Sequence, residues 1–316
     1  MAFLPSLSVL TSVFNGERFL PDFFRNLREQ TLFPELEIIL VLNEPTAAEK
    51  QMVIDFQQRA PNQVEIIYAK KRETLGASWN RAWKISRARY LAFWNVDDRR
   101  IVDSLQRQMN ALEAHPDWNL CYGDYLAVSA YGSETGKRRY APEYRASNFR
   151  RSFAQGGAFW FLRKDVSNAI NYFDEQFFVA PDMEFSFRMA VKGLDMGKCE
   201  GLLGYFTDTG TGLSTRGGAR LSEIERTVIQ LRYGVFDKVD RRLLNVTDAY
   251  RLTSIKVDNS WIDLESILPN LSKELQWKRP LWILGYLRGW FRAALRRIGL
   301  LDDLYAAQDK YLKREI

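Results

Sequence analysis

The sequence predicts an α/β fold, with a mostly parallel, Rossmann-like sheet flanked by helices and a helical C-terminal tail. Short apolar runs rich in β-branched residues alternate with amphipathic helical segments over residues 7–98. The strand-like runs carry apolar residues at both parities, which is typical of strands covered on both faces. Repeated strand–helix–strand units require crossover connections, so the strands are expected to be parallel with helices on both faces.

The first half of the chain contains four expected strands and three expected helices. The first helix has its apolar residues at helical spacing, from Phe19 to Leu27. The strands are expected at 7–13, 37–42, 64–68 and 90–94, and the helices at 17–30, 46–59 and 77–87. Beyond Asp98 we expect strands at 120–128 and 158–162, helices at 165–170, 183–191 and 221–233, and a helical or irregular tail from 237.

Composition excludes several classes of protein. The chain has one histidine in 316 residues, His115 at an expected helix end, so chemistry that needs a histidine base or several histidine ligands is excluded. The two cysteines lack metal-ligand spacing, which fits a reducing compartment. No apolar run reaches the ~18 residues that span a bilayer, and residues 1–5 do not resemble a signal peptide. No Gly-x-Gly-x-x-Gly follows the first strand, and no Walker loop occurs.

Polar and aromatic residues follow each of the first four strands. They are 14–15, 43–44, 70–72 and 95–98. In such sheets ligands bind beyond the carboxyl ends of the strands, so these residues are expected to line one crevice. Asp97 and Asp98 are hard oxygen ligands suited to Mg²⁺ or Mn²⁺. The alternative for Asp98 is a helix N-cap.

Five segments in order give the chain a resemblance to the family 2 glycosyltransferases, which have the GT-A fold. They are 8–17, 37–43, 75–82, 95–98 and 173–188, and the resemblance extends over 7–213. It implies a GT-A-like catalytic domain over 1–236, with a nucleotide-sugar half over about 1–100 and an acceptor half over about 101–236. Residues 237–316 are expected to form a helical extension.

The resemblance also implies roles for single residues in donor binding. Asp97 matches the aspartate that binds Mn²⁺ or Mg²⁺, and Asn95 stands where many relatives have the first aspartate. Asn43 replaces the usual base-facing aspartate, and Phe14 matches the aromatic residue that stacks on the base, with a core role as its alternative. The remaining expected contacts of the nucleotide sugar are Ser12, Asn15, Glu17, Arg72, Asn80 and Val96.

The catalytic base implied by the resemblance is Asp182, which would take a proton from the acceptor hydroxyl in an inverting, single-displacement transfer. Its alternative role is the N-cap of the following helix. Asp208 is the candidate for a second metal ligand in a loop that lacks the usual histidine, with a plain turn residue as the alternative. The expected acceptor residues are Gly156, Gly157, Trp160 and Glu184, and for Trp160 burial in the core stays open.

The segment 278–300 contains six basic residues and no acidic one, which equals the net charge of +6. Aromatic and aliphatic residues alternate with arginines here, and this pattern favours a helix lying on anionic lipid. The alternative is packing against protein. Nucleic-acid binding is disfavoured, because no nucleic-acid fold signature appears.

We therefore expect an inverting glycosyltransferase that moves one sugar from a nucleoside diphosphate sugar of the UDP, dTDP or GDP type. The acceptor would be a hydroxyl of a glycan or lipid-linked glycan in surface polysaccharide synthesis. The enzyme would be cytoplasmic and peripheral on the inner face of the cell membrane. The alternatives are a non-catalytic membrane-associated scaffold and a sugar nucleotidyltransferase, which needs a Gly-rich phosphate loop absent from 12–17.

Overall fold

A computed structural model of the chain describes residues 3–144 and 157–210 together with scattered positions beyond. Those positions are 212, 221, 222, 225, 226, 229, 233, 254–257, 260–263, 287, 290, 291 and 294. The chain divides into two compact units, Met1–Ala219 and Arg220–Ile316, which are described separately below. The expected boundary near 236 stays a prediction, and Gly156 lies outside the described residues.

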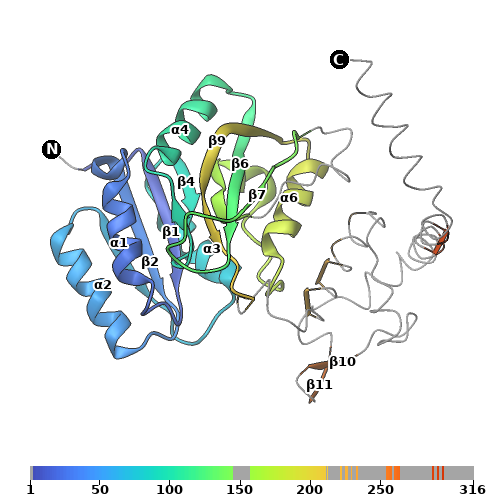
Figure 1. The fold of residues 1–316 in the computed structure, drawn as a ribbon, viewed down its shortest axis with the longest axis horizontal. Helices are drawn as coiled ribbons and strands as arrows, with labels where there is room; N and C mark the ends of the chain where they lie inside the picture. The colour runs from blue at the N-terminus through green and yellow to red at the C-terminus, as the bar shows by residue number, and fades with distance from the viewer. Residues whose placement is uncertain are drawn as a thin grey trace. The chain divides into compact units, whose positions relative to one another are not determined.

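The first half of the sheet is parallel, as predicted (Figure 1). Its strands run in the order β3-β2-β1-β4. Their bounds are β1 (Leu7–Val13), β2 (Leu36–Leu42), β3 (Val64–Tyr68) and β4 (Tyr90–Phe93). The helices between them are α1 (Leu20–Glu29), α2 (Ala47–Arg59) and α3 (Leu75–Ile85), with a 3-10 turn η1 (Phe33–Glu35) before β2.

Side-chain caps fix where two of these helices begin. Thr46 accepts from the Glu49 backbone N–H while Glu49 accepts from the Thr46 N–H, which forms a capping box at the start of α2. Thr74 accepts from the Ala77 N–H at the start of α3. Both helices therefore start immediately after the polar edge of the sheet.

The second half of the sheet is mixed and departs from the simple parallel pattern. Beyond β4 the order continues β8-β6-β9-β5, with β7 paired to β6. Only β6 and β9 run parallel here, and the other pairs are antiparallel. The strands are β5 (Arg99–Arg100), β6 (Trp118–Val128), β7 (Lys137–Arg139), β8 (Phe161–Arg163) and β9 (Asp195–Thr207), of which the sequence did not predict β5, β7 or β9.

The remaining helices of the first unit surround this mixed half. They are α4 (Ser104–Ala114), η3 (Gly157–Phe159), α5 (Val166–Ile170) and α6 (Pro181–Val191). His115 is the C-cap residue of α4, and its ring stacks on Trp118 with 3.9 Å between centroids. In the second unit, β10 (Ser254–Val257) and β11 (Ser260–Asp263) form an antiparallel hairpin within the expected helical tail. No described helix is long and apolar enough to cross a membrane.

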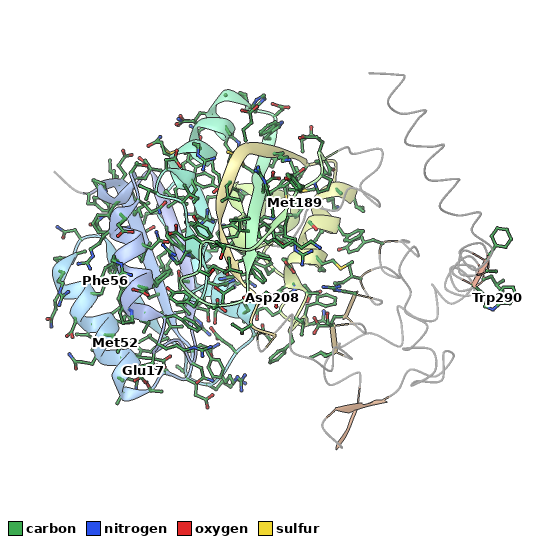
Figure 2. All side chains as sticks on the ribbon, viewed as in Figure 1. Glu17, Met52, Phe56, Met189, Asp208 and Trp290 are labelled. Atoms are coloured by element: carbon green, nitrogen blue, oxygen red, sulfur yellow. The ribbon has the colours of Figure 1, made fainter. Side chains whose placement is uncertain are left out.

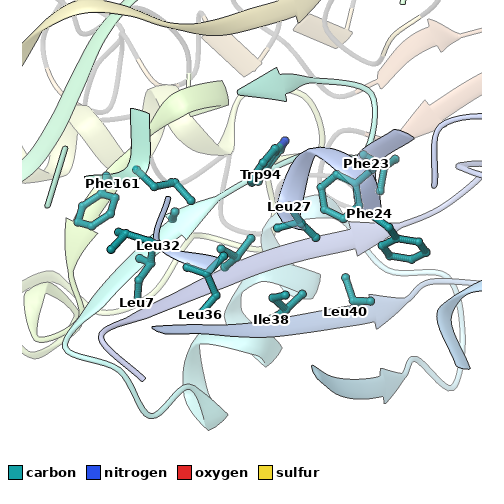
Figure 3. Packing of buried hydrophobic residues seen from close by; sticks show 14 of the residues in the cluster. Leu7, Phe23, Phe24, Leu27, Leu32, Leu36, Ile38, Leu40, Trp94 and Phe161 are labelled. Atoms are coloured by element: carbon teal, nitrogen blue, oxygen red, sulfur yellow. The ribbon is translucent and has the colours of Figure 1, made fainter. Parts of the chain in front are cut away.

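Buried apolar residues form two clusters, one on each face of the sheet. Alternate residues of β2 divide between them, since Ile38 belongs to one cluster and Ile39 to the other. Helix α1 covers the first face with Phe23 and Phe24 (Figure 3), and Phe56 of α2 stacks on Phe24. Aromatic residues of α3 and α6 cover the second face. The two-sided coverage explains why the strands read as continuous apolar runs.

Candidate active site

The loops after β1 and β2 adopt strained backbone conformations at the carboxyl edge of the sheet. Asn15 and Glu44 have φ angles of 50° and 58°, in the left-handed region that non-glycine residues rarely adopt. Between these loops the Gly16 N–H donates to the buried Glu49 carboxylate at 2.5 Å. A Cβ at Gly16 would lie 3.1 Å from Val96 Cγ2. The loop after β1 therefore packs closely against the loop after β4.

Phe14 and Arg72 meet at this edge. The Arg72 guanidinium lies 4.1 Å from the centroid of the Phe14 ring, in a cation–π contact between the loop after β1 and the loop after β3. The ring is half-buried and belongs to neither core cluster, which excludes the core alternative for Phe14. Asn15 and Glu17 are exposed beside it, and Ser12 is half-buried.

Asn43 holds a loop together. Its amide donates to the Glu73 carbonyl at 2.9 Å and accepts from the Glu73 N–H at 3.0 Å, so it pairs with the Glu73 backbone as a strand neighbour would. The side chain is only 4% exposed. In the structure Asn43 therefore fixes the loop that carries Arg72, and its expected contact with the base stays a prediction.

Asn80 has a similar structural role. It donates to the Phe173 carbonyl and to the Glu175 carboxylate, both at 2.9 Å, and accepts from the Phe173 N–H at 2.9 Å. At 2% exposure it has no surface for a substrate. The expectation that Asn80 contacts the nucleotide sugar is wrong because the side chain is buried and both of its N–H groups are donated within the protein.

Asp97 and Asp98 face different surroundings. Asp97 is half-buried, and burial raises its pKa while Arg18 opposes the shift. Asp98 is 1% exposed and accepts from the Thr207 N–H at 3.1 Å and from the Asn95 amide at 3.3 Å. Burial, with the charge of Asp97 added to it, raises the pKa of Asp98 well above its ordinary value. The N-cap alternative for Asp98 is wrong, because α4 begins later, with Asp103 as its N-cap residue.

The bond between Asp98 and Thr207 connects the loop after β4 to the end of β9. The next residue, Asp208, donates its N–H to the Val128 carbonyl at the end of β6, 2.8 Å away (Figure 2). Asp208 is half-buried, and it accepts from the Gly210 N–H at 3.4 Å, as a turn residue does. The structure therefore brings Asp208 to the same edge of the sheet as the Asp97–Asp98 pair, although about 110 residues separate them in sequence.

Asp182 lies in the first turn of α6, whose N-cap residue is Ala180, so the N-cap alternative for Asp182 is wrong. Its Oδ2 accepts from the Gly157 N–H at 2.8 Å and its Oδ1 from the Met183 N–H at 2.8 Å. A Cβ added at Gly157 would lie 2.9 Å from the Asp182 Cβ. Gly157 therefore has a positioning role. Its backbone N–H holds the Asp182 carboxylate, and a residue with a side chain would be too close to Asp182.

Two residues expected to bind the acceptor belong to the interior. Trp160 is 1% exposed in the core and packs on Phe185 with 6.1 Å between ring centroids. Glu184 is also 1% exposed and forms a two-point ion pair with Arg188, at 2.7 and 3.1 Å. Both acceptor assignments are corrected, because neither side chain presents a surface to a ligand.

Tyr125 is not among the residues predicted from the sequence, and it lies between the segment that holds Asp182 and the strand end that holds Asp98. Its ring packs on Phe159 and Phe206, with 5.6 and 5.8 Å between centroids. Phe159 shares η3 with Gly157, and Phe206 precedes the Thr207 that bonds Asp98. Burial raises the pKa of Tyr125, and the charges of the site aspartates raise it further. Only the pairing of β6 with its neighbours places this residue.

The protein side chains supply few ligands for a metal ion. Within the described residues no cluster of three or more His, Cys, Asp or Glu could hold one. Burial raises the pKa of both adjacent carboxylates, and the charge of Asp97 adds to the shift of Asp98, so two acidic groups share one desolvated place at the edge of the sheet. Mg²⁺ usually takes one or two carboxylates and completes its coordination with phosphate and water. The residues present fit a cation that arrives with a diphosphate.

Residues 8–173 match the family described as glycosyl transferase family 2, and this match includes more than half of the chain. The chain belongs to that family.

Two curated relatives are similar over part of the chain. An uncharacterized glycosyltransferase of Methanocaldococcus jannaschii is 25% identical over 130 residues, which are 41% of this chain and 44% of that protein. The putative teichuronic acid biosynthesis glycosyltransferase TuaG of Bacillus subtilis is 22% identical over 139 residues, 44% of this chain and 54% of that protein. The chain thus spans about half the length of the curated relatives it matches.

Solved structures share the fold. S. aureus TarS residues 1–349 in complex with UDP has a TM-score of 0.57 and 16% identity, with 89% of each chain covered. The complex of the same protein with UDP-GlcNAc has a TM-score of 0.57 and 17% identity, covering 89% of this chain and 79% of that one. The mannosyltransferase PcManGT of Pyrobaculum calidifontis, with GDP-Man and Mn²⁺, has a TM-score of 0.52 and 14% identity, covering 98% and 87%.

Proposed function

We propose that this protein is an inverting glycosyltransferase that moves one sugar from a nucleoside diphosphate sugar to a hydroxyl of a glycan acceptor in surface polysaccharide synthesis. The observation that carries the proposal is that Tyr125 packs between Phe159 and Phe206, close enough to Asp98, Asp182 and Asp208 for their charges to raise its pKa, with Asp97 next to Asp98 in the chain. TarS bound to UDP-GlcNAc and PcManGT bound to GDP-Man support a nucleotide-sugar donor. TuaG supports a polysaccharide acceptor.

The donor would bind across the carboxyl edge of β1–β4. Phe14 offers a ring to the base, and Arg72 on its face brings a cation toward the phosphates. Asp97 would hold Mn²⁺ or Mg²⁺ together with the diphosphate, and Asp208 would add a second carboxylate. When bound, such an ion neutralises charge on the departing diphosphate.

Asp182 is the proposed general base. The acceptor oxygen forms a bond to the anomeric carbon as the bond from that carbon to the diphosphate oxygen breaks, and the electron pair leaves with the diphosphate. The acceptor proton passes to the Asp182 carboxylate. Attack opposite the leaving group inverts the configuration. The hydrogen bonds from Gly157 and Met183 fix the orientation of this carboxylate, which is a requirement for efficient proton transfer.

Asp182→Asn should reduce transfer by about 10²–10⁴-fold while nucleotide affinity stays near that of the wild type. Asp97→Asn should remove the Mn²⁺ dependence of nucleotide binding. Asp55→Asn on α2 is the matched control, since it makes the same chemical change away from the site.

UDP, dTDP and GDP sugars would be screened by thermal shift with and without Mn²⁺, followed by assays of nucleotide release. Wild-type protein that neither binds nor hydrolyses any of these donors would refute the enzyme proposal and favour a scaffold.

We also propose that the tail contacts anionic lipid. Leu287, Trp290 and Phe291 are helical and 53%, 59% and 61% exposed, at spacings that place them on one face (Figure 2). Arg288 and Arg292 adjoin them in sequence. The other tail residues within 278–300, except Ala294, lie outside the described residues. Sedimentation with phosphatidylglycerol vesicles tests this contact, and equal sedimentation of Trp290→Ser would refute it.

A further inference from the structure

The β6–β7 hairpin adds positive charge to the carboxylate-rich site. In this antiparallel pair Tyr125 lies opposite Arg139, and Ala127 lies opposite Lys137. Directly opposite residues of an antiparallel pair project on the same face of the sheet. Arg139 and Lys137 therefore share the face of Tyr125, the residue that lies between the Asp182 and Asp98 regions.

The three basic residues of β7 have different surroundings, as the alternation of a strand requires. Arg138 projects to the opposite face, where its guanidinium pairs with the Asp124 carboxylate at 3.0 Å. Lys137 and Arg139 are both exposed, and among the described residues no carboxylate forms an ion pair with either. The charge of Arg138 is compensated within the protein, whereas those of Lys137 and Arg139 are not.

The hairpin is held in place against the site. Arg99, which directly follows Asp98, donates to the Gly132 carbonyl at 3.0 Å and pairs with Glu134 at 3.3 Å. A Cβ at Gly136 would lie 2.2 Å from the Ala127 carbonyl oxygen, so the return strand approaches β6 as closely as only glycine permits. The two free cations are thus on an anchored element.

Arg139 and the carboxylates of the site both act on the pKa of the Tyr125 hydroxyl. The charge of Arg139 lowers the pKa of Tyr125, while Asp98, Asp182 and Asp208 raise it. Such Coulomb effects decay with distance, so these four charged groups lie near Tyr125. A ligand beside Tyr125 would therefore lie near both the proposed base and Arg139, with Lys137 two residues from Arg139 on the same face of β7.

We propose that the acceptor is an anionic glycan, and that Lys137 and Arg139 bind its phosphate or carboxylate groups next to the hydroxyl that receives the sugar. This inference rests on the proposed transferase function for the identity of the site. It goes further by assigning a charge class to the acceptor. An anionic group on the acceptor would pair with these two exposed cations, which form no ion pair with a described carboxylate, whereas a neutral glycan would gain no such charge pairing.

The experiment measures binding by the full chain without donor. Fluorescence anisotropy would be recorded with a labelled glycerol phosphate oligomer, a labelled oligogalacturonate and a labelled neutral dextran oligomer of similar length. The variant is Lys137→Gln with Arg139→Gln. Its matched control is Lys50→Gln with Arg59→Gln, two exposed residues of α2 whose loss changes the net charge equally. The two anionic probes distinguish phosphate from carboxylate as the bound group.

We expect at least one anionic probe to bind more tightly than dextran. The β7 double variant should bind that probe about tenfold more weakly at low salt, and the difference in affinity should shrink as the salt concentration rises. The α2 control should bind as the wild type does. Once a donor is known, the β7 variant should raise the KM for the anionic acceptor and leave kcat unchanged.

Equal affinity for dextran and the anionic probes would overturn the proposal, as would a β7 variant that binds like its control. An oligodeoxynucleotide of equal charge that binds as tightly would also overturn it, since the surface would then be a general polyanion site. Failure of the transferase function would appear separately, as absence of donor turnover by protein that still binds the anionic probe.

Discussion

Adding one methyl group at Gly157 should disable the proposed base without touching its carboxylate. The Gly157 N–H holds Asp182 Oδ2 at 2.8 Å. The Cβ of an alanine at this position would lie 2.9 Å from Asp182 Cβ and 3.5 Å from Oδ2. The position of the Asp182 Cβ is fixed by the backbone of α6, and no side-chain rotation moves it. Either α6 or the backbone at residue 157 must therefore shift.

The size of the effect follows from these distances. Carbon atoms prefer separations of about 3.5–4.0 Å, so relief requires a displacement of about 0.6–1 Å. Overpacking of this kind costs about 1–3 kcal/mol of stability. A misplacement of about 1 Å at a catalytic group costs about 10²-fold in rate. Gly157→Ala should therefore lower transfer about 100-fold while the protein still folds.

Gly76→Ala is the matched control, because it lies beside the same helix. Its Cβ would meet Pro181 at 3.5 Å and Phe173 at 3.4 Å, which are ordinary contacts, and alanine is favoured in a helix by up to about 1 kcal/mol. Both variants would be compared by thermal unfolding and by nucleotide release from the donor identified in the screen. A folded Gly157→Ala protein with wild-type kcat would refute the assignment of Asp182 as a base held in position by Gly157.

Two further predictions concern tyrosines. Tyr125→Phe should lower turnover about tenfold and leave the affinity for the donor's nucleotide unchanged, with Tyr205→Phe as control; equal turnover of the two variants would exclude a substrate contact by the Tyr125 hydroxyl. Burial, followed by the charge of Asp22, raises the pKa of Tyr131 to about 12, so its contribution to stability is present below the ordinary value of about 10 and is lost as pH rises through 12. Urea unfolding should then show wild type losing stability relative to Tyr131→Phe between about pH 10 and 12, and a constant difference over that range would contradict the assigned shift.

The sequence determined the parallel half of the sheet because its signals are local. Helix caps at Thr46 and Thr74, apolar periodicity and strand-length runs all lie within a few residues of one another. Expected and observed bounds agree closely for β1–β4 and α1–α3. The position of Asp97 at the carboxyl edge followed directly, because strand direction fixes where that edge lies.

Tertiary structure alone decided which polar residues face a ligand. Asn43 departs from the family pattern and Asn80 matches it, yet both amides hydrogen-bond to protein backbone, that of Glu73 and that of Phe173. Whether an amide is free depends on partners 30 and 93 residues away, and no local pattern encodes those distances.

Asp97–Asp98 could be recognised from sequence as a pair of hard ligands following a strand. The different environments of the two carboxylates could not be predicted from the sequence. The Thr207 N–H that donates to Asp98 belongs to β9, a strand that the sequence did not predict. The same strand brings Asp208 to the site, and the β6–β7 register sets Arg139 beside Tyr125. The sequence therefore determines which chemical groups follow each strand. How deeply those groups are buried, and which charges lie beside them, depends on the order of the strands in the sheet, which arises from long-range pairing.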